Sequence, residues 1–159
     1  MKQDHYMRHL GLQPTNRTNR EGLPSFTAPG DGIPPCSEEA ERCVLGAILI
    51  DAERVMDVCA EKGLRTESFY GGENRFMFEA AMSLWRDGRP IDALTVSEKL
   101  RTMGELDRLG GTTFVDGFID ATPTAAHAEY YADLVVSKDL LRRTIHCATV
   151  WGRTKARTT

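Results

Sequence analysis

Cysteine and histidine are the residues of this chain whose chemistry would be easiest to recognise, because their spacing reveals metal sites and disulfides. His5 and His9 could face each other on a helix, but they lie in a polar segment without a helical pattern. The cysteines, none of them in a Cys-x-x-Cys pair, are Cys36, Cys43, Cys59 and Cys147. Zinc needs ligands paired at short spacing, and disulfide frameworks are typical of short secreted chains. We therefore expect no metal site and no cofactor in this chain.

Carboxylates are the other candidates for chemistry, as general acids or bases. Glu38, Glu39 and Glu41 open an apolar helical run, and Asp116 and Asp120 lie within another. Charge at a helix start or on a solvated face explains these positions better than acid–base catalysis. A phosphate-binding loop requires Gly-Lys followed by Ser or Thr, and the sequence contains no Gly-Lys pair. We expect no catalytic residue and no enzymatic activity in this chain.

Composition limits the class of protein further. The chain has 159 residues and a formal net charge of -3, which suits one core-forming domain without a global attraction to nucleic acid. No apolar run is long enough to span a membrane, and the polar start lacks the apolar core of a secretory signal. These features favour a cytoplasmic protein that makes no membrane contact.

Four regions follow from the distribution of apolar residues. Residues 1–33 are too polar to bury a core and are predicted to form a flexible arm. Residues 34–123 are predicted to form a compact helical bundle, the head. Residues 124–150 contain no Pro or Gly and predict one long helix, which Gly152 would end before a tail at 151–159.

Helical periodicity and capping residues make the fold class all-α. Ser37, after two prolines, can cap a helix whose apolar residues recur at helical spacing, and Gly46 inside it indicates close packing by another element. Asp51 is placed to cap the second helix, and Thr95 with Glu98 reads as a capping box for a later one. No segment shows the alternation of a half-buried strand.

The long helix presents an apolar stripe for which the sequence provides no second covering helix. Such a stripe requires another surface, so we expect it to mediate self-association or partner binding. The alternative is that the stripe folds back on its own head. The candidate contact residues are Tyr131, Leu134, Val135, Lys138, Leu141 and Ile145.

An ordered series of motifs resembles the N-terminal domain of the bacterial replicative DNA helicase, the DnaB family. It opens with Pro34-Pro35-x-Ser37-x-Glu39-Ala40-Glu41-x-x-Val44-Leu45-Gly46-Ala47. It continues through Phe69-Tyr70, Phe76, Gly88-x-Pro90-Ile91-Asp92, Thr95-x-x-Glu98-x-Leu100, Leu106, Gly110-Gly111, Thr122-Pro123-Thr124-Ala125-Ala126 and Tyr131-Ala132-Asp133-x-Val135. The resemblance covers about residues 34–147.

This resemblance implies a helical head followed by the first helix of a hairpin, in the non-catalytic part of the parent protein. It implies self-association, as dimers within a hexamer of the parent, and binding of primase and in some systems a helicase loader. ATP and Mg would belong to the parent's motor domain, and any DNA contact would be weak or indirect. Apart from the resemblance, a nucleic-acid-binding helical module is a further hypothesis that the acidic balance of the chain supports little. Its candidate residues form a basic end: Arg142, Arg143, Arg153, Lys155 and Arg157.

Two other readings remain open. The chain could be a stand-alone adaptor or decoy that binds a host helicase or primase, because it resembles only the head and the first hairpin helix. It could instead be the helicase-binding domain of a primase, which has a similar helical architecture. The Pro34-to-Ala47 opening argues against the second of these.

Overall fold

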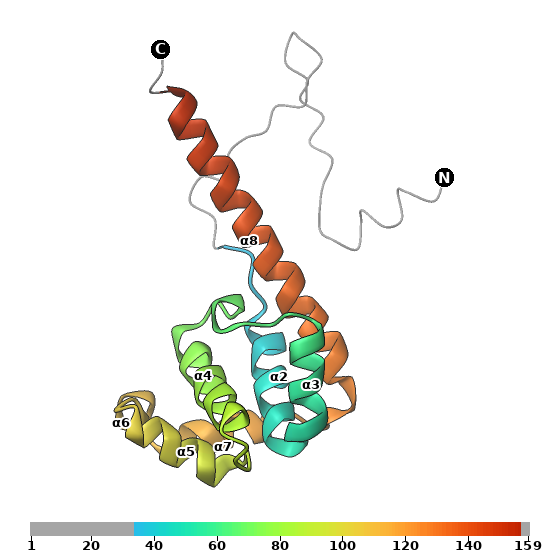
Figure 1. The fold of residues 1–159 in the computed structure, drawn as a ribbon, viewed down its shortest axis with the longest axis vertical. Coiled ribbons are helices and arrows are strands. Elements are labelled where there is room, and N and C mark those ends of the chain that lie inside the picture. Colours follow the sequence, from blue (N-terminus) through green and yellow to red (C-terminus); the bar gives the residue numbers. More distant parts are fainter. Residues whose placement is uncertain (1–33, 157–159) are drawn as a thin grey trace. The chain divides into compact units, whose positions relative to one another are not determined.

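The head is organised around α2 (Glu38–Ile50) (Figure 1). This helix contacts α3 (Ala52–Glu61), α4 (Gly72–Arg86), α7 (Thr112–Asp120) and α8 (Ala128–Ala156). The computed structural model describes residues 34–156, so the predicted arm and the last three residues of the predicted tail lie outside the described residues. Val44, Leu45, Ala47 and Ile48 are all buried, covering more than one face of α2. A helix that is apolar on several sides belongs at the centre of a bundle.

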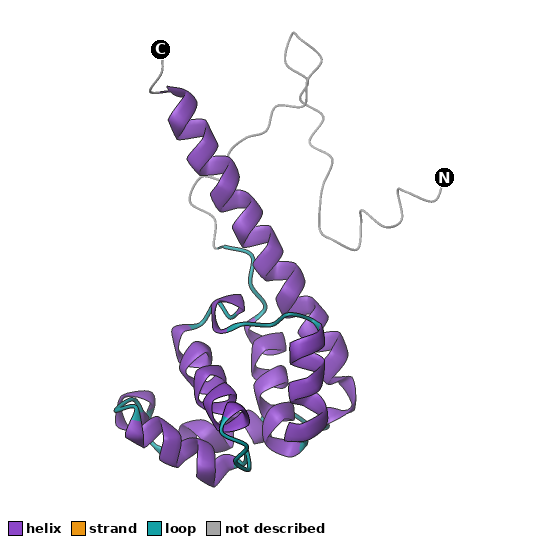
Figure 2. Cartoon of the chain, viewed as in Figure 1, coloured by secondary structure: helices purple, strands orange, loops and turns teal. Residues whose placement is uncertain are grey.

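Helices and loops make up the whole described range (Figure 2). None of the described helices combines the length and apolar content that a membrane span requires. After α2 the order is α3 (Ala52–Glu61), the 3-10 turn η1 (Thr66–Ser68), α4 (Gly72–Arg86), α5 (Ala93–Thr102), α6 (Leu106–Leu109), α7 (Thr112–Asp120), the 3-10 turn η2 (Ala125–His127) and α8 (Ala128–Ala156). The predicted all-α class is confirmed.

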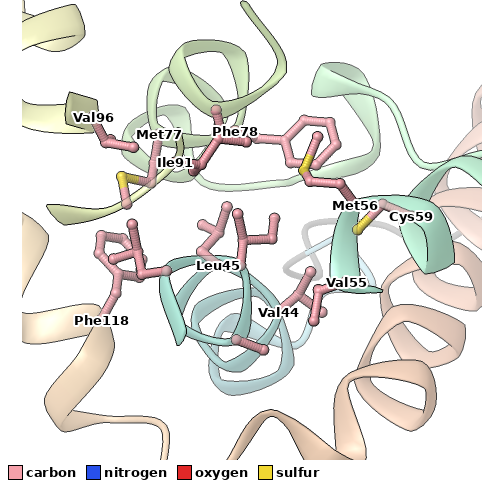
Figure 3. Close-up of a cluster of buried hydrophobic side chains, with 14 of the residues drawn as sticks. Val44, Leu45, Val55, Met56, Cys59, Met77, Phe78, Ile91, Val96 and Phe118 are labelled. Carbon is pink, nitrogen blue, oxygen red and sulfur yellow. The ribbon is translucent and has the colours of Figure 1, made fainter. Parts of the chain in front are cut away.

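Side chains from several helices meet in one hydrophobic core (Figure 3). The Phe69 and Phe78 rings pack with their centroids 4.7 Å apart, joining the end of η1 to α4. Cys59 of α3 is also buried in this core, and burial raises the pKa of its thiol to about 12. A thiol in such an apolar environment stays protonated and inert, so it packs as a small hydrophobe.

Two of the predicted caps differ from the observed ones. Asp92 caps α5 by accepting from the Thr95 amide at 2.8 Å, and the Thr95 hydroxyl accepts from the Asp92 amide at 2.9 Å. The capping box therefore begins three residues before the predicted Thr95–Glu98 pair, because Asp92 is itself a strong cap. Asp51 precedes α3 as predicted, but its carboxylate accepts from Arg54 Nε at 2.8 Å and caps no amide.

The start and end of α8 also differ from the prediction. Thr124 caps the η2 turn by accepting from the Ala126 amide at 3.1 Å, and α8 begins only at Ala128. At its other end α8 runs through Gly152 to Ala156. The expectation that Gly152 ends the helix was wrong, because a single glycine costs only about 1 kcal/mol in a helix and does not by itself break it.

Gly46 lies where α2 meets the end of α7. A Cβ atom at this position would fall 2.1 Å from the Thr122 hydroxyl oxygen and 2.2 Å from the Phe118 carbonyl oxygen. The Thr122 hydroxyl itself donates to the Phe118 carbonyl at 2.9 Å, so neither atom is free to move away. The close packing predicted for this glycine is confirmed.

We expect Gly46→Ala to lower the free energy of unfolding by about 3 kcal/mol, because the added methyl group would have to displace backbone. Urea denaturation followed by circular dichroism measures this change. Gly72→Ala is the matched control, since a Cβ at Gly72 meets nothing within 4 Å. Equal stability of the two variants would show that α2 and α7 are not in close contact at Gly46.

Candidate functional site

One face of α8 belongs to the core of the head. Ala128, Ala132 and Val135 are 0–1% exposed, and Asp139 continues the same face with 8% exposure. Spacings of four, three and four residues place these side chains on one side of a helix. Val135, predicted from the sequence as a contact residue, is therefore a core residue of the head and is not available to a partner.

Arg142 joins α8 to the head, and its turn is the last turn of α8 that the head supports. Its guanidinium donates to the Pro35 carbonyl at 2.8 Å and to the Ser68 carbonyl at 2.5 Å. The same group lies 3.5 Å from the Asp139 carboxylate and 5.8 Å from the centre of the Tyr70 ring. Arg142 was predicted only as part of a basic end, whereas the structure uses it to hold three separate segments together.

The contacts of Arg142 with Pro35, Ser68 and Tyr70 form a junction between α8 and the head, and Asp139 of α8 is also part of it. Its carboxylate accepts from the Ser68 hydroxyl at 3.4 Å, and it pairs with Arg142 and, at 4.0 Å, with Arg143. A buried carboxylate needs such partners, because removing it from water is costly unless charge and hydrogen bonds compensate. The sequence signal for this anchor was one acidic residue within a basic stretch of α8.

A second set of contacts joins α8 to α3. The Lys62 ammonium lies 3.1 Å from the Glu129 carboxylate and 2.9 Å from the Asp133 carboxylate. The hydrogen bonds that the Lys62 ammonium donates to the carboxylates of Asp133 and Glu129 raise the pKa of Lys62. These pairs are partly solvated, so they orient α3 against α8 more than they stabilise the fold.

Glu41 supports the junction from α2. It is 2% exposed and accepts from the Tyr70 amide at 2.8 Å, the Gly71 amide at 3.3 Å and the Asn74 side-chain nitrogen at 2.8 Å. It thereby holds the start of α4 and the backbone of Tyr70, over whose ring Arg142 lies. Glu41 was grouped with Glu38 and Glu39 as helix-start charge, but its role is to satisfy buried donors.

The rest of the predicted stripe lies beside the core face and becomes more exposed along the helix. Tyr131 and Leu134 are half-buried against the core, Lys138 and Ile145 are half-buried, and Leu141 is 49% exposed. These five positions alternate spacings of three and four residues, the pattern of a helix–helix seam. Val135 does not belong to this repeat, and the structure places it with Ala128, Ala132 and Asp139 on the core face of α8.

Some exposed apolar residues of α8 were missed in the sequence. Tyr130 is 62% exposed, Leu140 60% and Trp151 75%. They interrupt the helical period of the stripe, so periodicity alone does not select them.

The described side chains contain no cluster of three or more His, Cys, Asp or Glu that could hold a metal. The candidate site is the partly exposed apolar surface of α8.

The described chain is a helical head with one long, partly uncovered helix, and the comparisons identify its family. Residues 33–137 match the model of the DnaB-like helicase N terminal domain. The chain belongs to this family. The family assignment made from the ordered motifs is confirmed.

Curated relatives share substantial identity with this chain. The replicative DNA helicase DnaB of Geobacillus stearothermophilus is 40% identical over 117 residues, which cover 74% of this chain and 25% of the relative. That of Leifsonia xyli subsp. xyli is 34% identical over 141 residues, which cover 89% of this chain and 29% of the relative. The chain thus spans only about a quarter of the length of these relatives.

Solved structures agree with the fold. The N-terminal domain of DnaB helicase from Mycobacterium tuberculosis matches with a TM-score of 0.69 and 37% identity, covering 74% of this chain and 83% of that one. A DnaB-like replicative helicase, solved in a study of its interactions with primase, matches with a TM-score of 0.61 and 24% identity. It covers 71% of this chain and 26% of that one, and this likeness concerns the fold alone.

We expect Glu41→Ala to lower the free energy of unfolding by about 3 kcal/mol, because it leaves buried donors near Tyr70 and Asn74 without an acceptor. Thermal or urea unfolding measures the loss. Glu79→Ala, at an exposed position of α4, should change stability by less than about 0.5 kcal/mol. A Glu41 variant as stable as the Glu79 variant would contradict the role assigned to this carboxylate.

Proposed function

We propose that this chain acts as the non-catalytic N-terminal domain of a replicative DNA helicase, associating with other copies through α8 and binding primase. The observation that carries the proposal is that the head covers the seam only in part: Leu141 is 49% exposed, and Ile145 beyond it is half-buried. Past Arg142 every described side chain of α8 is exposed or only half-buried. An isolated helix of this kind is marginal in water, so packing against another helix would stabilise it.

The composition of the seam supports a helical partner. Leu134, Leu141 and Ile145 recur at seven and four residues, and Lys138 lies between them. Leucine and isoleucine at such positions pack into the spaces between side chains of a facing helix. A single lysine in the seam lowers the stability of the pairing and restricts its register. A second copy of the chain offers the same seam.

Primase is proposed as a partner from family membership and from the fold shared with a helicase studied together with primase. Loader binding and the ATP and Mg of a parent motor domain rest on family membership alone. The family match is to the helicase domain, so it does not support the alternative of a primase domain. We expect the isolated chain to hydrolyse no ATP, because its sequence lacks the Gly-Lys pair that a phosphate-binding loop requires.

Light scattering after size-exclusion chromatography, over a range of chain concentrations, tests the self-association. We expect a concentration-dependent dimer or larger species, and we expect Leu141→Asp to weaken it at least tenfold, because the substitution places a charge in an apolar seam. Leu94→Asp is the matched control, since Leu94 is 71% exposed on α5 of the head.

The control should associate like the parent chain. A chain that stays monomeric at every concentration, or one whose association is unaffected by Leu141→Asp, would remove self-association through α8 from the proposal. An effect of equal size from Leu94→Asp would place the contact on the head instead.

A further inference from the structure

A second surface lies where η1 meets α8, on a different side of the helix from the seam. An open depression of about 490 Å³ is found there. Its lining includes Arg65, Glu67, Asp139, Arg142, Arg143 and His146. The depression is thus built from two residues next to or within η1 and from one face of α8.

The acidic groups of this depression do not neutralise its basic ones. Asp139 is already engaged by Arg142 and by the Ser68 hydroxyl, and its contact with Arg143 is 4.0 Å long. Arg143 keeps 62% of its side chain exposed. Arg65 and His146 form no ion pair within the part of the chain that the structure describes. Glu67 is the only other carboxylate in the lining, so the depression retains excess positive charge.

The sequence of α8 reinforces this charge. From residue 138 to the end of the chain Asp139 is the only acidic residue. The basic residues in the same stretch are Lys138, Arg142, Arg143, Arg153, Lys155 and Arg157. The chain as a whole carries a formal net charge of -3. Positive charge is therefore concentrated in the last part of a sequence whose other residues are acidic overall, and such a local concentration of charge attracts anionic groups.

The depression and the seam can be occupied together. Arg143 is two residues from Leu141 and two from Ile145, and side chains at that spacing do not share a helix face. Arg143 and His146, at a spacing of three, lie on the side of the depression. A partner bound to Arg143 and His146 would leave the seam open to a second copy.

We propose that this junction depression binds an acidic segment of a partner protein. Aspartate or glutamate side chains would form charge-assisted hydrogen bonds with Arg65 and Arg143, which have donors to spare. The exposed Glu67 carboxylate can accept hydrogen bonds from peptide N–H groups or from a lysine. A phosphodiester backbone has no donor and would be repelled by Glu67, so the mixed lining favours a peptide over nucleic acid. This assignment deepens the partner binding of the proposed function without depending on self-association.

Fluorescence anisotropy at low ionic strength tests the proposal with two probes. One is a short fluorescein-labelled peptide rich in aspartate with a single lysine, and the other is a labelled single-stranded oligothymidylate. We expect the chain to bind the peptide, and we expect Arg65→Glu and Arg143→Glu each to weaken that binding roughly tenfold. Arg86→Glu, at an exposed position of α4, is the matched control and should bind the peptide like the parent chain.

Leu141→Asp should retain peptide binding, so a failure of self-association is distinguishable from a failure of this site. Three results would overturn the proposal: no binding of the peptide, equal loss in the Arg86 variant, or unchanged binding in the Arg65 and Arg143 variants. Tighter binding of the oligothymidylate, lost in those same two variants, would instead make the depression a nucleic-acid site. Circular dichroism spectra confirm that each exposed substitution leaves the helices intact.

Discussion

The continuity of α8 is the constraint on which the account of this domain depends. An unbroken helix carries its direction from one end to the other, so anchoring its first half determines where the second half lies relative to the head. Ala128, Ala132 and Val135 place the first half in the core, and Arg142 ties the last supported turn to Pro35 and Ser68. Everything proposed for the outer half follows from its lack of comparable cover.

The packed core of the head provides the base for this helix. Gly46 lets α2 lie close to the end of α7, and Glu41 holds the loop that leads into α4. Both residues belong to α2, which also contacts α8. The central helix α2 therefore positions the core, the loop at Tyr70 and Gly71, and the half of α8 that packs on the head. Loss of the close packing at Gly46 or of the Glu41 hydrogen bonds would alter the surface of α8 as well as lower the stability of the head.

Much of the fold could be predicted from local patterns. Helical periodicity, Ser37 and the glycine within α2 gave the all-α class and the close packing of α2. The Asp92 cap was missed because Thr95 and Glu98 fit the same rule, and only the folded chain shows which pair forms. The site was harder to predict, because apolar residues lie on two sides of α8 and helical spacing alone does not show that the head covers Val135 and leaves Leu141 exposed. The junction of Arg142 with Pro35 and Ser68 joins segments far apart in sequence, so no local pattern indicates it.

Amide hydrogen exchange along α8, measured at low and high chain concentration, tests most directly whether other molecules cover its outer half. We predict that amides from 132 to 139 are protected at both concentrations, because they lie beyond the first turn of α8 and the head covers this part of the helix. Amides from 141 to 151 should exchange quickly in dilute solution and gain protection as the concentration rises. Rapid exchange of the outer half at every concentration, or full protection in the dilute monomer, would contradict the account.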